Sequence, residues 1–66
     1  MQTIRKTVTS RVFNRTKGWE DVALRVELVI DDDAIIERLA VRAYKNKSGS
    51  SSFMNGAVVI RAKLNP

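Results

Sequence analysis

The residues best suited to chemistry in this chain are basic, and many of them stand at alternating positions of extended segments. The alternating cations are Arg5, Arg11, Arg25, Arg61 and Lys63. Every second residue of a strand points to the same face of a sheet, so cations at this spacing can line one pleated surface and follow a phosphate backbone. The pattern indicates a surface for an anionic ligand, either nucleic acid or a nucleotide.

A second candidate site for an anion begins at residue 45. Lys45, Lys47, Ser48, Gly49 and Ser50 offer ammonium groups, hydroxyls and a glycine-relaxed backbone. Such a combination can form an anion-binding nest. It lacks the spacing of a nucleotide-binding P-loop, and it follows a helix instead of preceding one. The simpler interpretation is a helix-to-strand connection whose lysines complement the helix dipole.

The acidic triplet Asp31-Asp32-Asp33 is the other cluster of chemically capable side chains. Clustered carboxylates can hold a divalent cation, but the spaced ligands of a calcium loop are missing, so helix capping explains the triplet better. The chain contains no His and no Cys. Their absence excludes disulfides and the common zinc sites, and removes the usual general base and thiol nucleophile. We therefore expect a non-enzyme with no metal and no cofactor.

The cations need a sheet to position them, and the hydrophobic pattern predicts one. Residues 4–13 alternate as a strand, the polar segment 14–18 suits a hairpin turn, and residues 19–30 form the clearest strand. Its apolar row is Val22, Leu24, Val26, Leu28 and Ile30. Residues 57–64 alternate as a third strand.

Between the second and third strands the apolar spacing becomes helical, from Ala34 to Lys45. Gly49 is placed to end this helix in a left-handed conformation, and residues 48–52 read as a loop. Asn55-Gly56 is a further turn signal.

These elements predict one domain over residues 1–66, of the α+β class, with a three-stranded sheet, one helix packed on one face, and the element order β-β-α-β. The second strand is apolar on part of both faces, which favours a central position and the spatial order 1-2-3, with a parallel crossover to the last strand. The fully antiparallel order 2-1-3 is the alternative.

Composition adds expectations about partners and compartment. The net charge of +5 favours anionic partners. The first residues lack the apolar core of a signal peptide, and no apolar stretch is long enough to span a bilayer. We therefore expect a cytoplasmic protein without membrane association. For a domain this short, apolar burial barely offsets ordering entropy, so we also expect a homo-oligomer.

The resulting hypothesis is a small non-enzymatic binding module for nucleic acid or a nucleotide, acting as a homo-oligomer. The basic face has two other interpretations, an ordinary solvated surface and an oligomer interface. The alternative function is a protein-interaction or inhibitor module of the kind that phages and other mobile elements encode. Its contacts with a host protein would come from an exposed strand edge, Trp19 or the neighbouring pair Phe53 and Met54.

Overall fold

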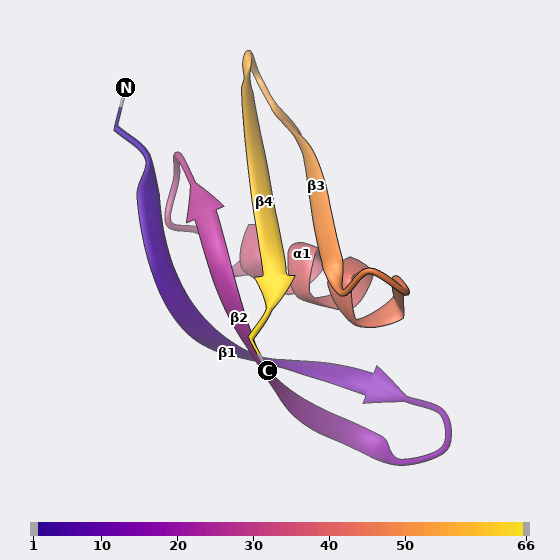
Figure 1. The fold of residues 1–66 in the computed structure, drawn as a ribbon. Helices are drawn as coiled ribbons and strands as arrows, with labels where there is room; N and C mark the ends of the chain where they lie inside the picture. Colours follow the sequence, from indigo (N-terminus) through magenta and orange to yellow (C-terminus); the bar gives the residue numbers. More distant parts are fainter. Residues whose placement is uncertain (1, 66) are drawn as a thin grey trace.

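The computed structural model describes residues 2–65 and contains four strands and one helix in that range. The elements are β1 (Ile4–Asn14), β2 (Gly18–Leu28), α1 (Asp33–Lys45), β3 (Ser50–Asn55) and β4 (Val58–Leu64). The strands form an antiparallel sheet in the order β1-β2-β4-β3, and α1 packs on one face of it (Figure 1). The α+β class is confirmed, whereas the predicted three-stranded sheet with the order β-β-α-β is wrong.

The strand missing from that prediction is β3. Its serine-rich start, Ser50-Ser51-Ser52, resembles a loop because serine favours turns over strands. In the fold it pairs with β4 along its whole length. The side of β3 that faces α1 is covered. There the Ser51 hydroxyl donates to the Leu39 carbonyl at 2.8 Å, and Phe53 packs against the core.

The extra strand also changes the direction of the last one. Because β3 and β4 form a hairpin, β4 returns antiparallel to β2 and lies between β2 and β3. The last strand is therefore beside the second strand, as the order 1-2-3 requires, but the predicted parallel crossover is wrong. The alternative order 2-1-3 is wrong as well, because β1 occupies an edge.

The sheet consists of two hairpins that overlap over a short distance. β1 and β2 pair without a bulge from Ile4 and Leu28 to Asn14 and Gly18. By contrast, β2 pairs with β4 only where residues 24–27 meet residues 61–64. The two hairpins therefore project to opposite ends of the molecule, which measures 40 × 20 × 18 Å (Figure 1).

The core lies between α1 and the middle of the sheet. The helix contributes Ile36, Leu39, Ala40 and Ala43, and the sheet contributes Val12, Leu24, Val26, Leu28, Ile60 and Ala62. Ile30 was predicted to continue the apolar row of β2, but it is 56% exposed, because the strand ends at Leu28 and Val29 packs against the core instead. The described helix α1 is neither long nor apolar enough to cross a membrane.

Side chains and glycines fix the ends of the elements. Asp32 is the N-cap of α1 and accepts a hydrogen bond from the Ala34 N–H at 2.9 Å, as the capping interpretation of the acidic triplet predicted. The helix ends at Lys45 with Asn46 as C-cap. Gly49 does have a positive φ of 70°, but it leads into β3 and does not end the helix. Gly56, with φ 66°, starts the two-residue turn between β3 and β4.

Candidate anion-binding face

The sheet face turned away from α1, the open face, carries two rows of polar side chains that cross all four strands. One row is Thr7, Arg25, Lys63 and Ser50, each directly opposite the next; the other is Arg5, Glu27, Arg61 and Ser52. The rows are two residues apart on every strand, so they share a face and lie about 7 Å from each other. We call them the basic rows.

Positive charge is in excess in the basic rows, with four cations against one carboxylate. Glu27 pairs with Arg5, its oxygen 3.4 Å from the guanidinium Nε. Arg25 and Lys63 are direct cross-strand neighbours, and no ion pair within residues 2–65 includes either of them or Arg61. Like charges directly opposite each other destabilise a sheet, so a bound anion here would remove a repulsion as well as form contacts.

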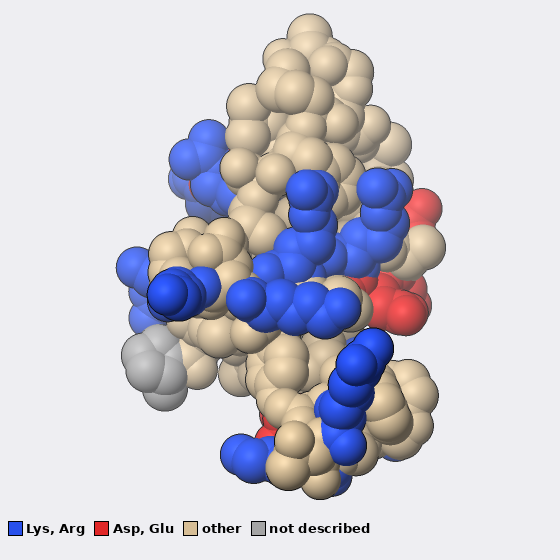
Figure 2. Space-filling view, turned by 90° about the vertical axis from the view of Figure 1, so that its right-hand side faces the viewer, with Lys and Arg blue, Asp and Glu red and all other residues tan. Residues whose placement is uncertain are grey.

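A groove connects the basic rows to the end of the helix. Besides the open-face side chains, its lining includes Arg42, Lys45 and Asn46 of α1 and its C-cap. Figure 2, which views the side on which β3 and α1 lie in Figure 1, shows Lys and Arg side chains across the middle and at the lower end of the molecule, whereas the upper end, formed by the tip of the β3–β4 hairpin, shows none. This agrees with the sequence, in which residues 48–60 include no charged residue. The tip of the β3–β4 hairpin is therefore free of charged side chains, while cations lie at mid-sheet and, as Arg11, Arg15 and Lys17, at the β1–β2 end.

The predicted anion loop after residue 45 is divided by the fold. Lys45 and Ser50 line the groove, while Lys47 and Ser48 are exposed in the turn outside it. The Ser48 N–H donates to Oδ1 of Asn46 at 3.2 Å, and the Gly49 N–H donates to the Asn46 carbonyl at 3.0 Å. These two backbone donors are already used, so the loop offers an anion mainly its side chains.

Arg11 lies apart from the other predicted cations, beside an exposed aromatic pair. Phe13 and Trp19 are direct cross-strand neighbours near the β1–β2 turn, on the open face, and are 54% and 61% exposed. Their ring centroids are 5.5 Å apart in an edge-to-face arrangement. The Arg11 guanidinium lies 5.0 Å from the indole centroid, and its Nε is 4.0 Å from Asp21. We call Phe13 and Trp19 the aromatic pair.

The predicted partner contacts Phe53 and Met54 point to opposite faces. Phe53 lies on the helix side, where the guanidinium carbons of Arg38 and Arg42 are 5.0 and 5.8 Å from its ring centroid. Met54 is on the open face, 60% exposed and opposite Val59, which is 39% exposed. Met54 and Trp19 are thus available to a partner, whereas Phe53 is largely covered.

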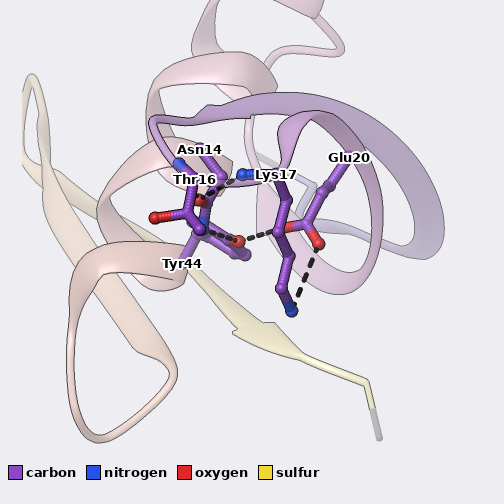
Figure 3. Close-up of polar contacts among 5 residues, drawn as sticks. All are labelled: Asn14, Thr16, Lys17, Glu20 and Tyr44. Carbon is purple, nitrogen blue, oxygen red and sulfur yellow. Dashed lines mark hydrogen bonds and ion pairs between the residues drawn. The ribbon is translucent and has the colours of Figure 1, made fainter.

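Sequence reasoning missed a polar cluster that joins the β1–β2 turn, next to the aromatic pair, to α1 (Figure 3). The Tyr44 hydroxyl of α1 donates to the Glu20 carboxylate and accepts from the Asn14 amide at 2.8 Å. Oδ1 of Asn14 accepts from the N–H groups of Thr16 and Lys17 at 2.8 and 3.0 Å, and the Lys17 ammonium lies 3.8 Å from Glu20. The cluster links the hairpin turn to the helix, although Glu20 and Tyr44 are 24 residues apart in the sequence. No local sequence motif predicts such a contact.

Comparisons with protein-family models, curated protein sequences and solved structures each found no match.

Proposed function

We propose that this chain is a small non-enzymatic binding module for nucleic acid, acting in the cytoplasm, with the open face as its contact surface. The observation that carries the proposal is the juxtaposition of Arg25 and Lys63 without an acidic partner in the described chain. Ser50 is directly opposite Lys63, and Ser52 is opposite Arg61 in the neighbouring row. Charge combined with hydrogen-bond donors is what a phosphate group requires.

The extent of the charged surface favours a polymer over a single nucleotide. The basic rows cross four strands, a width of about 14 Å at the usual strand spacing. Arg11 is six residues beyond Arg5 on the same face, about 20 Å farther along β1. A chain of phosphates can contact both regions at once.

The charges predict the salt dependence of binding. If Arg5, Arg25, Arg61 and Lys63 each neutralise one phosphate, log K should fall against log salt concentration with a slope of about −3. Between ~50 and ~200 mM salt the affinity should then fall by roughly 50- to 150-fold.

Fluorescence anisotropy with labelled DNA and RNA oligonucleotides tests the proposal. Lys63→Gln should reduce the slope by about 0.7 to 0.9, the effect of one phosphate contact. Lys47→Gln is the matched control, since it makes the same change of charge in the turn outside the groove, and it should leave the slope unchanged. Absence of binding at ~50 mM salt, or equal effects of the two substitutions, would refute the proposal.

We also propose that the module works as a homo-oligomer joined through the uncharged β3–β4 hairpin. The accessible surface is 4857 Å², whereas compact monomers of 7.4 kDa expose about 4,200 Å². Met54 and Val59 supply exposed apolar area there, while the like-charged basic rows oppose pairing of two open faces. Light scattering should report a mass above 7.4 kDa, and Met54→Lys should reduce it to that of the monomer.

A second candidate function is docking on a host protein, which the same uncharged end favours. Met54 is exposed there, on a stretch of 13 residues, 48–60, without charge. Binding of a partner protein that survives high salt and is lost on Met54→Ala, or on Trp19→Ala, would support this function over nucleic-acid binding.

A further inference from the structure

We infer that the nucleic acid bound by this chain is single-stranded and that one of its bases stacks on Trp19. The inference rests on the proposed binding of nucleic acid to the open face. It adds that the nucleic acid is single-stranded, and it adds an aromatic stacking contact to the contacts between cations and phosphates.

The aromatic pair has the exposure and surroundings that base stacking requires. Trp19 is the chain's one tryptophan, and it is 61% exposed although Phe13 packs against it edge to face. Arg11 lies 5.0 Å from the indole centroid and can contact the base or its phosphate. Stacking of this kind accepts any base, because every base has a π-face.

The aromatic pair and the basic rows lie on the same face of the β1–β2 hairpin, separated by the cross-strand pairs Thr9–Ala23 and Arg11–Asp21, the second of which is an ion pair. β1 and β2 pair without a bulge, so Phe13 and Arg5 point to one side of the sheet, about 26 Å apart along the strand. At mid-distance the cross-strand neighbours are Thr9 and Ala23, which are both small. A strand of nucleic acid can therefore lie along the hairpin, with phosphates at the basic rows and a base at Trp19.

This arrangement selects against a duplex. In a duplex the base faces are stacked on one another and are not accessible to a side chain, whereas a single strand can turn a base outward onto an aromatic ring. Duplex DNA could still contact the cations, but it would leave Trp19 in water.

The hairpin end is held in place before any ligand binds. Asn14 follows Phe13 and Glu20 follows Trp19 in the sequence, and both are hydrogen-bonded to the Tyr44 hydroxyl of α1 (Figure 3). Because these anchors lie on the helix side of the same hairpin, the rings are displayed on a supported surface. Little ordering is then required on binding, which preserves affinity.

Fluorescence of Trp19 provides a direct test, with an oligothymidylate of about 12 nucleotides, within the site sizes of sheet-based single-strand binders, and a duplex of equal length as probes. The single strand should quench the emission in a saturable manner, while the duplex should bind more weakly and leave the emission nearly unchanged. Trp19→Ala should weaken single-strand binding by roughly 5- to 150-fold, and Trp19→Phe should weaken it much less.

The salt dependence separates this inference from the proposed function. Trp19→Ala removes no phosphate contact, so its salt slope should equal that of the wild type, and its far-UV circular dichroism should be unchanged. Single-strand binding with unquenched Trp19 and undiminished affinity in Trp19→Ala would overturn stacking but leave nucleic-acid binding intact. Preference for the duplex would overturn the inference as well, and failure of both probes to bind would overturn the proposed function itself.

Discussion

Replacement of Lys63 by Gln should stabilise the folded protein while it weakens nucleic-acid binding. Lys63 is directly opposite Arg25, and no ion pair of the described residues compensates either charge. Glutamine is close to lysine in length, remains polar at this exposed position and removes the repulsion. An opposite effect on stability and on binding is typical of residues that a fold positions for a ligand.

The expected gain follows from the geometry of the pair. Directly opposite residues have Cβ atoms about 5 Å apart, and their flexible exposed side chains can separate the charges to about 8 Å. In water two unit charges at that distance repel by about 0.5 kcal/mol. For a domain of this size, that gain corresponds to an increase in Tm of about 2 to 4 °C.

Urea unfolding followed by circular dichroism can resolve this difference. The free energy of unfolding of a small domain falls by about 1 kcal/mol per M urea, so the urea midpoint of Lys63→Gln should lie about 0.5 M above that of the wild type. A double-mutant cycle with Arg25→Gln should give a repulsive coupling of about 0.5 kcal/mol. At ~1 M salt, where charges are screened within ~3 Å, the coupling should nearly vanish.

Two results would refute the reasoning. If Lys63→Gln lowered the urea midpoint, Lys63 would be stabilising the fold through a contact that the described ion pairs do not include. If the coupling to Arg25 were attractive or independent of salt, the two charges would not repel each other as their register implies. Lys47→Gln, at the end of α1 where a cation complements the helix dipole, should leave the midpoint unchanged or lower it slightly.

Two further predictions concern the scaffold. Tyr44→Phe removes the hydroxyl that bonds Asn14 and Glu20 but keeps the ring, so it should cost about 1 to 2 kcal/mol in urea unfolding; an unchanged midpoint would show that the cluster does not secure the hairpin. Gly56→Ala places a Cβ where no atom lies within 4 Å, so only the positive φ should make it unfavourable. The expected loss of stability is about 1 kcal/mol, or a Tm lower by about 4 to 8 °C. An unchanged Tm would contradict the assigned turn.

The candidate site was predictable from the sequence in its members but not in its arrangement. Alternation within single strands identified Arg5, Arg25, Arg61 and Lys63, since side-chain direction in a strand depends only on parity. The same parity included Arg11, which lies about 20 Å from Arg5 beside Trp19. Which cations face one another depends on the register between strands, and the register is set by contacts distant in sequence.

Local pattern determined β1, β2, α1 and β4, because alternation, helical spacing, the Asp32 cap and the Gly56 turn are all properties of neighbouring residues. Tertiary structure alone decided that Ser50–Asn55 is a strand. Serines form a strand there because β4 supplies hydrogen-bond partners and the Leu39 carbonyl accepts from Ser51. That pairing made β4 antiparallel to β2, placed Lys63 opposite Arg25, and so created the anion-binding face from residues that are separate in the sequence.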